Sequence, residues 1–267
     1  MYYQSIEPLF SNSRSSRLNS FFVNLASIYR FVGRTFRNAV LPPYETKEIL
    51  RQSYQIGVRT FALVGFTAFI AGIVFTRQSR PSLQEFGAES WLPSLVSIAI
   101  VRSLGPLITG LICAGRVGSS IGAELSSMKV TEQIDAMEVS GTKPFHYLVV
   151  SRVTAAAVMV PILVIYADVI ALLGSFVATN YFSQTSFALY WTQALSSLTL
   201  LDVISSVGKG VLYGLAIGLV SCYTGYNSGG GTVGVGKAAN TAVVTSMFMI
   251  FILDLLSLQI IEFFRGT

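Results

Sequence analysis

Long apolar runs alternate with short polar segments along most of the chain. A helix of ~20 mostly apolar residues is long enough to cross the hydrocarbon core of a bilayer. The pattern predicts five such helices, at about Thr60 to Thr76, Pro93 to Cys113, Val153 to Ala178, Val207 to Tyr223 and Ala239 to Phe263. Pro161 lies inside the third window, where a proline is expected to kink the helix.

The segment from 18 to 36 has a different pattern, with apolar and basic residues on separate helical faces. The arginines Arg30, Arg34 and Arg37 recur at steps of four and three. Such a helix tends to lie in the membrane surface with its arginines at the headgroups, although a soluble helix packed on a partner is the alternative. Its apolar positions are Leu18, Phe21, Phe22, Leu25, Ile28, Tyr29, Val32 and Phe36, and Leu41-Pro42-Pro43 is expected to end it.

Composition agrees with a membrane protein. Of 267 residues, 52% are hydrophobic and 12% are charged, against about 25% charged in soluble globular proteins. We therefore expect an all-α integral membrane protein. It would consist of an interfacial N-terminal arm, residues 1–48, and a transmembrane domain, residues 49–267.

The basic residues are unevenly distributed. Residues 1–59 contain eight basic and three acidic side chains, a difference that equals the whole net charge of +5. Beside a membrane span, such an arm favours anionic lipid headgroups over nucleic acid. An N-terminus inside the cell places thirteen basic residues on the inner side and four on the outer side. The positive-inside rule therefore predicts a cytoplasmic N-terminus and a periplasmic C-terminus.

Features of enzymes are mostly missing. His146 is the only histidine, Cys113 and Cys222 lie in apolar segments, and neither GxSxG nor HExxH occurs. Gly231 to Ala238 fits GxxxxGK but ends in alanine, where a phosphate-binding loop needs Ser or Thr for magnesium. We expect no catalytic residue, no metal site and no cofactor bound by this chain. If ATP is used, another chain binds it together with its magnesium.

Three further segments have patterns that leave alternatives open. Small residues recur every four positions at Gly110, Ala114, Gly118 and Gly122, and again at Gly210, Gly214 and Gly218. Each ladder allows close helix approach, either at a subunit or gate interface or in ordinary packing within one chain. The aromatic outer segment from about Thr179 to Ser206 suits an interfacial or reentrant helix, or the lip of a transport path.

The inner loop ELSSMKVTEQIDAMEVSGTK, from Glu124 to Lys143, is the most informative polar segment. Its apolar positions Val130, Ile134 and Met137 share one helical face. Glu132 and Asp135 share another face, with Glu138 close by. A short amphipathic helix with an acidic face suits docking to a soluble protein. A solvated loop helix is the alternative.

This region carries a resemblance to a known family. The segment LGPLITGLICAGRVGSSIGAELSSMKVTEQIDAMEVSGTKP resembles the signature of the MlaE/YrbE permeases, whose relatives include a plastid permease. GGGTVGVGKAANTAVV resembles the second signature of the family, and the likeness extends over about Ile49 to Ile261. It implies a dimer at the centre of an ABC transporter that moves phospholipids or related lipids.

The resemblance also implies partners and roles. Two cytoplasmic ATPase subunits would drive the transporter, often with a STAS-domain protein attached, and periplasmic MCE-domain proteins would pass lipid through a tunnel. In a bacterium, the location would be the cytoplasmic (inner) membrane, and the role would be in outer-membrane lipid asymmetry. The EQIDA segment corresponds to the coupling helix, which makes Glu132, Gln133, Asp135 and Glu138 the candidate ATPase contacts.

Two basic residues lie in the predicted spans, Arg102 within the second and Lys209 at the start of the fourth. A central arginine costs ~2.5–3.5 kcal/mol on insertion scales. Our hypothesis, supported by the resemblance, is that both face a lipid cavity and attract a phosphate or carboxylate headgroup. The alternatives are snorkelling, or pairing with an acidic residue, for which Asp168, Asp202 and Asp254 are candidates.

One departure from the family concerns Arg102. The family commonly has Arg-Glu-Leu-Gly-Pro, whereas this chain has Ser103 after the arginine. The adjacent counter-charge is therefore missing, and the lipid itself can differ. The alternatives to a phospholipid permease are a sterol or fatty-acid importer of the same family and an ion-coupled secondary transporter. A third alternative is a membrane scaffold that only anchors the ring of MCE-domain proteins and the ATPase.

Overall fold

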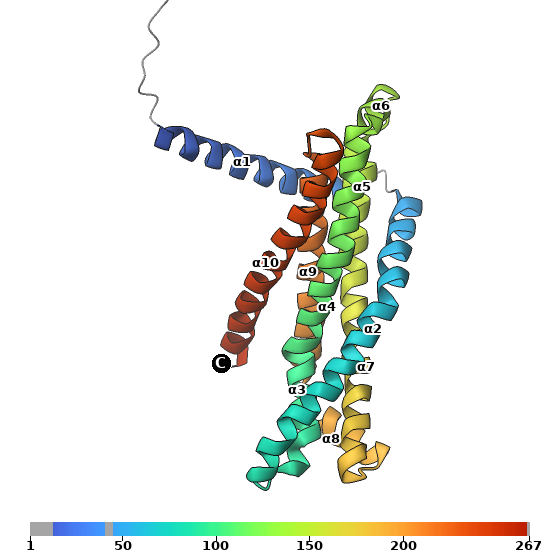
Figure 1. Ribbon diagram of the computed structural model, residues 1–267, viewed down its shortest axis with the longest axis vertical. Helices are drawn as coiled ribbons and strands as arrows, with labels where there is room; N and C mark the ends of the chain where they lie inside the picture. Colours follow the sequence, from blue (N-terminus) through green and yellow to red (C-terminus); the bar gives the residue numbers. More distant parts are fainter. Residues whose placement is uncertain (1–12, 41–44, 266–267) are drawn as a thin grey trace, which may run out of the picture.

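The computed structural model describes residues 13–40 and 45–265, and within them every regular element is a helix. Five helical segments are long and apolar enough to cross a membrane, which confirms the five predicted spans. They are α2 (Thr46–Glu85), the composite segment Glu89–Val130, the segment Phe145–Ser183, α9 (Leu200–Tyr226) and α10 (Gly231–Arg265). They lie side by side as an elongated bundle (Figure 1).

The second span is a chain of short helical pieces. It runs through η1 (Glu89–Trp91), α3 (Leu92–Ala99), η2 (Ile100–Leu104), α4 (Gly105–Cys113), η3 (Ala114–Gly118) and α5 (Ser119–Val130). Two of these pieces, η2 and η3, are π-helical turns, and each contains one arginine, Arg102 or Arg116. Single π turns within α-helices are frequent at functional sites. The third span likewise opens with a π-helical turn, η4 (Phe145–Val150), before α7 (Ser151–Ser183).

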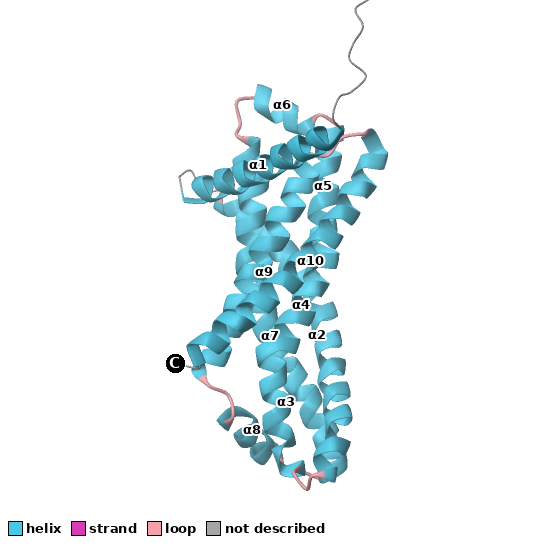
Figure 2. Cartoon of the chain, turned by 90° about the vertical axis from the view of Figure 1, so that its left-hand side faces the viewer, coloured by secondary structure: helices cyan, strands magenta, loops and turns pink. Residues whose placement is uncertain are grey.

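The N-terminal helix α1 (Ser13–Val40) lies across one end of the bundle (Figures 1 and 2). Phe31 is buried and meets the rings of Phe145 and Tyr223 edge-on, with centroids 5.2 and 5.3 Å away. The guanidinium of Arg34 stacks 4.2 Å from the Phe145 ring. Ile28 and other apolar positions of α1 remain exposed, as expected of a helix that lies in a membrane surface.

Part of the predicted arm falls outside the description. Residues 1–12 and 41–44, and with them Pro42 and Pro43, lie outside the described residues, and so do the side chains of Leu18, Phe21, Phe22 and Leu25.

Two short helices cap opposite ends of the bundle (Figure 1). The helix α6 (Gln133–Val139) lies at the same end as α1, and α8 (Phe187–Ser196) lies at the other end beside α3. The aromatic segment predicted as an interfacial or reentrant piece therefore contains one short helix. Ser97 ties α8 to α3 because its hydroxyl donates to the carbonyl of Ala194 over 2.9 Å.

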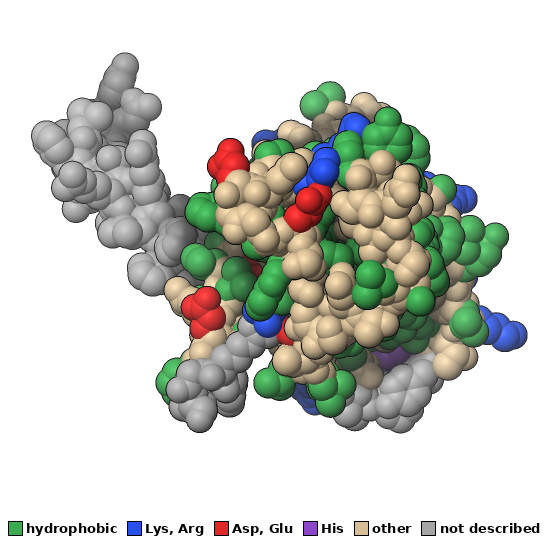
Figure 3. All heavy atoms as spheres, turned by 90° about the horizontal axis from the view of Figure 1, so that it is seen from below, with side chains coloured by type: hydrophobic (Ala, Val, Ile, Leu, Met, Phe, Trp, Pro, Cys, Tyr) green, Lys and Arg blue, Asp and Glu red, His purple; other side chains and the backbone are tan. Residues whose placement is uncertain are grey.

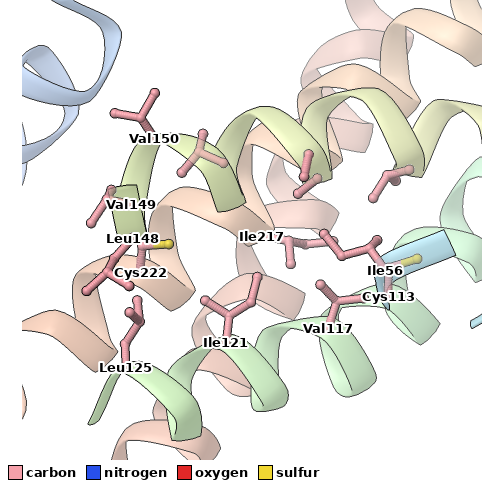
Figure 4. Packing of buried hydrophobic residues seen from close by; sticks show 14 of the residues in the cluster. Ile56, Cys113, Val117, Ile121, Leu125, Leu148, Val149, Val150, Ile217 and Cys222 are labelled. Atoms are coloured by element: carbon pink, nitrogen blue, oxygen red, sulfur yellow. The ribbon is translucent and has the colours of Figure 1, made fainter. Parts of the chain in front are cut away.

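The core lies where α7 meets α2 and α9. Gly72 on α2 and Gly174 on α7 let these two backbones touch, since a Cβ at either position would overlap the facing backbone. One large apolar cluster, part of which Figure 4 shows, fills the half of the bundle near α6. Apolar side chains also form much of the outline seen along the bundle axis (Figure 3), as expected for a surface in contact with lipid.

Candidate functional site

Arg102 and Asp202 form an ion pair between the second and fourth spans. The guanidinium donates from Nε to Asp202 Oδ1 over 2.7 Å and from NH2 to Oδ2 over 3.3 Å. Asp202 is fully buried, whereas the side chain of Arg102 keeps 34% of its surface exposed. The counter-charge that Ser103 does not provide thus comes from another helix.

Asp202 has a second task at the start of α9. Its Oδ2 accepts hydrogen bonds from the backbone amide of Thr199 over 2.9 Å and from the Thr199 hydroxyl over 2.7 Å. This is the Asp half of a capping box, which satisfies backbone donors that a helix start leaves free. Because the carboxylate is held from both sides, the position of Arg102 depends on the first turn of α9.

Lys209 lies seven residues after Asp202 on α9. It is almost completely enclosed, with 1% of its side chain exposed. Its Nζ donates to Asp254 Oδ1 of α10 over 2.7 Å and to the backbone carbonyl of Arg102 over 2.9 Å. The hydroxyl of Tyr213 donates to the same Oδ1 over 2.7 Å. Each buried charge therefore has an opposite charge and further hydrogen bonds, which burial in an apolar medium requires.

These four charged residues form one network that joins three spans and sums to zero formal charge. Pairing with Asp202 and Asp254, one of the alternatives left open by the sequence, is what the structure contains. Lys209 offers no exposed surface to a headgroup in this arrangement. Arg102 does, because its side chain is one-third exposed and Asp202 occupies only Nε and NH2 among its nitrogens in the described contacts. Headgroup binding by either residue stays a prediction.

Asp168, the third acidic candidate, pairs with neither cation. Its Oδ2 accepts from the Ser206 hydroxyl over 2.9 Å, and its Oδ1 lies against Gly105. A side chain at Gly105 would overlap this carboxyl oxygen, so the glycine makes room for it. The cavity beside Gly105 encloses about 10 Å³, which is far too small for a lipid.

The predicted coupling segment forms the separate helix α6. Ile134 is buried against the large core cluster, whereas Glu132, Gln133, Asp135 and Glu138 are all exposed. Asp135 accepts a hydrogen bond from Lys129 over 2.7 Å. Val139 is 91% exposed at the end of the helix. Helix α6 lies at one end of the bundle (Figure 1), so these exposed acidic groups and the exposed Val139 are presented at that end.

Both small-residue ladders pack within the chain. Gly210 and Gly214 lie against Pro161 and Ala156 of α7. In the first ladder, Gly110 meets Tyr213, Gly118 meets Ser221 and Gly122 meets Ala242, while Ala114 is fully buried. Helices α7, α9 and α10 of the same chain therefore lie against these faces, which is the within-chain alternative left open by the sequence. A role of either ladder at a subunit interface stays a prediction.

The glycine-rich segment that resembles a phosphate-binding loop is helical. Gly231 to Lys237 form the first turns of α10, and the helix α9 precedes them where a nucleotide site would have a strand. Cys113 and Cys222 are buried. In the part of the chain that the structure describes, no group of His, Cys, Asp and Glu side chains has the arrangement of a metal site.

Two elements of the site were not predicted. The π turn around Arg102 has no composition signal, and Tyr213 does not stand out in the sequence because a tyrosine in an apolar window usually only fills space. Its spacing of four from Lys209 places both on one face of α9, and this spacing is the signal that could have identified it.

Comparison with known proteins places the chain among permeases. A family model described as Permease MlaE matches residues 49–260. A probable ABC transporter permease protein of Rickettsia typhi is 38% identical over 239 residues, which cover 90% of this chain and 92% of the relative. A probable ABC transporter permease protein of Synechocystis is 32% identical over 243 residues, which cover 90% of this chain and 92% of the relative. A protein of the same description from Porphyra purpurea is 34% identical, with 75% and 76% covered.

Proposed function

The chain belongs to the MlaE permease family and is the permease subunit of an ABC transporter; on this premise we propose that it moves phospholipids. The cargo would pass between the cytoplasmic membrane and a periplasmic tunnel of MCE-domain proteins. The chain itself is non-catalytic, and hydrolysis of ATP with its magnesium takes place on a separate ATPase subunit.

The observation that carries the phospholipid proposal is the exposure of Arg102. An arginine that remains 34% exposed within a spanning segment needs a polar partner or a ligand. Its Asp202 contacts use Nε and NH2, and a guanidinium has five N–H donors in total. The remaining donors suit the oxygens of a headgroup phosphate. Lys209 helps to fix the position of Arg102, because its ammonium group donates a hydrogen bond to the backbone carbonyl of Arg102.

A second copy of the chain is proposed as the other wall of the lipid site. Among the five spans, α10 has the smallest buried share, 17% of its apolar window. Phe248, Ile252 and Leu255 are each more than half exposed along it. A second permease subunit, in the simplest case an identical one, would cover this apolar surface and enclose a cavity wide enough for acyl chains.

Coupling to the ATPase is proposed through α6. The exposed Glu132, which precedes the helix, and Gln133 and Glu138 within it would meet basic groups of the ATPase. Val139 would fill an apolar pocket there. Asp135 would take part less directly because Lys129 already holds it. A STAS-domain protein would be attached to the ATPase.

The distribution of basic residues supports the proposed orientation. With α1 and α6 at the cytoplasmic face of the inner membrane, the arginines of α1 meet anionic headgroups and α6 meets the ATPase. The opposite end of the bundle, with α8, would then face the periplasmic MCE-domain protein.

Purification of the tagged chain in mild detergent tests this proposal. Mass spectrometry of the co-purifying material is expected to identify an ABC ATPase, an MCE-domain protein and bound phospholipid. Sterol or fatty acid in place of phospholipid would reassign the cargo within the same family. If both partner proteins copurified without any bound lipid, the phospholipid proposal would be contradicted.

A further inference from the structure

A second group of polar side chains lies far from Arg102, between α2 and the end of the second span near α6. A cavity there encloses about 70 Å³. Its lining includes Arg59 and Thr60 of α2, Arg116 of the π turn η3, and Ser120 and Glu124 of α5. Since about 10–15 Å³ of such space is enough to hold one water, the cavity is sufficient for a small polar group and insufficient for an acyl chain.

The two arginines give this cavity its charge. Both side chains are exposed, and among the described residues neither Arg59 nor Arg116 has a carboxylate partner. Glu124 is already held by the buried Arg152, whose NH2 lies 2.8 Å from Glu124 Oε1. The one acidic group of the lining is thus compensated from behind, and the cavity keeps an excess of positive charge.

Thr60 provides an independent sign that a ligand belongs here. The residue is 1% exposed, and its hydroxyl has no hydrogen-bond partner. A buried polar atom without a partner is costly and rare. A threonine in a helix usually bonds back to its own helix, as Thr67 and Thr76 do on the same α2. Thr60 belongs to the lining of the cavity, and a small rotation of its side chain toward a ligand oxygen would satisfy the hydroxyl.

The floor of the cavity is rigid and apolar. Ile56, Val117 and Ile121 line it and belong to the large core cluster. Figure 4 shows Ile56 of α2 next to Cys113, and Val117 and Ile121 follow along the second span. The two helices that carry the arginines are therefore fixed relative to each other, which reduces the entropy that a bound ligand must overcome.

The two arginines also mark a border along their helices. On α2, Arg59 immediately precedes the apolar run that ends at Arg77, a distance of ~27 Å at 1.5 Å per residue. This length is close to the ~30 Å of a hydrocarbon core. On the second span, Arg116 ends the apolar run of α4. A group bound between them lies where a helix surface changes from apolar to polar, as a lipid headgroup does.

From this arrangement we infer that Arg59, Arg116 and Thr60 form a second phosphate-binding site, which takes the headgroup phosphate of a membrane phospholipid on the side of α6. The shared chemistry is a phosphate monoester or diester bound by two guanidinium groups and one hydroxyl. The site is separate from Arg102, which lies about 21 Å away along the second span at 1.5 Å per residue. The inference does not depend on transport through the Arg102 site.

Native mass spectrometry of the full chain in detergent tests the site with two ligands. One is phosphatidylglycerol, and the other is diacylglycerol with the same acyl chains, which lacks the phosphate. Replacing both arginines (R59Q/R116Q) is expected to weaken phosphatidylglycerol binding at least about tenfold and to leave diacylglycerol unchanged. T60V is expected to have a smaller effect of the same sign. The matched control R77Q/K143Q removes two positive charges outside the cavity and should behave as wild type.

Two further experiments distinguish this site from Arg102, and a lipid phosphate from a soluble phosphate ester. In the R102Q background, R59Q/R116Q should still remove one phosphatidylglycerol molecule, whatever the role of Arg102. An excess of glycerol phosphate that displaces this molecule would assign the site to a soluble phosphate ester, while retention assigns it to lipid. The inference is overturned if R59Q/R116Q binds phosphatidylglycerol as wild type does, or if R77Q/K143Q loses as much.

Discussion

The ammonium group of Lys209 donates a hydrogen bond to the backbone carbonyl of Arg102 over 2.9 Å, across the contact between α9 and the π turn η2. This hydrogen bond links two ion pairs, because Arg102 is paired with Asp202 and Lys209 is paired with Asp254. A change at Asp254 is therefore transmitted to the backbone that carries the exposed guanidinium of Arg102.

The Lys209–Asp254 pair can be tested by breaking it from one side. D254N leaves a buried ammonium without its counter-charge, which should destabilise the fold by roughly 3–5 kcal/mol. The double variant K209M/D254L removes both charges and should regain most of that loss. Thermal unfolding in detergent, followed by tryptophan fluorescence, measures both. Equal stability of D254N and wild type would show that the pair is not compensating a buried charge.

The proposed headgroup binding by Arg102 can be tested with variants that separate the charge of the side chain from its geometry. R102K keeps the charge but cannot form the two-point contact with Asp202, and R102Q removes the charge. We expect retention of phospholipid after purification to fall in the order wild type, R102K, R102Q, with a loss of about tenfold for R102Q. R77Q, which changes an arginine at the end of the apolar run of α2, serves as the control. Unchanged retention in R102Q would exclude Arg102 from headgroup binding.

The proposed role of α6 in ATPase docking predicts that the effect of a charge reversal depends on its position. E138K replaces an exposed acidic group of α6 and should weaken association with the ATPase about tenfold, because an attractive contact becomes repulsive. E85K makes the same exchange at the exposed end of α2 on the opposite side of the bundle and should have no effect. Co-purification of the ATPase at increasing salt measures the difference. Similar losses in both variants would argue against docking through α6.

Close helix approach can be tested on α9 with two matched glycines. A Cβ at Gly214 would overlap the carbonyl of Ala156 on α7, whereas one at Gly208 meets nothing within 4 Å. G214A should therefore cost about 1–3 kcal/mol, as overpacking does. G208A should be neutral or stabilise by up to about 1 kcal/mol, because alanine favours the helix. Thermal unfolding distinguishes them, and equal behaviour would mean that α7 and α9 do not touch at Gly214.

The five spans were predictable because membrane insertion depends on length and apolarity, which the sequence displays directly. Their ends were not. The first apolar window ends at Thr76, yet α2 continues to Glu85, because polar residues also form helix once a bundle supports them. The helix α6 was predictable for a similar reason, since Ile134 and Met137 recur at helical spacing between polar residues.

The partners of the intramembrane cations could only be narrowed to three aspartates. Asp168, Asp202 and Asp254 all lie in or near apolar windows, and their distances along the chain do not say which one faces Arg102. The rotation of α9 about its axis determines which aspartate lies next to Arg102. Packing against α7 through Gly210 and Gly214 sets that rotation. A π turn shifts the backbone hydrogen bonds by one residue and thereby rotates the side chains that follow it about the helix axis. No pattern of residues in the sequence predicts such a turn.

ATP-dependent transfer of labelled phospholipid tests the central claim most directly. The chain would be reconstituted with its co-purifying ATPase in proteoliposomes, and movement of the label to an acceptor would be followed with and without ATP. We predict transfer that requires ATP and the ATPase, and that falls about tenfold in R102Q while the fold and the ATPase association persist. Transfer that proceeds equally without ATP, or an intact complex that hydrolyses ATP and moves no phospholipid, would contradict the account.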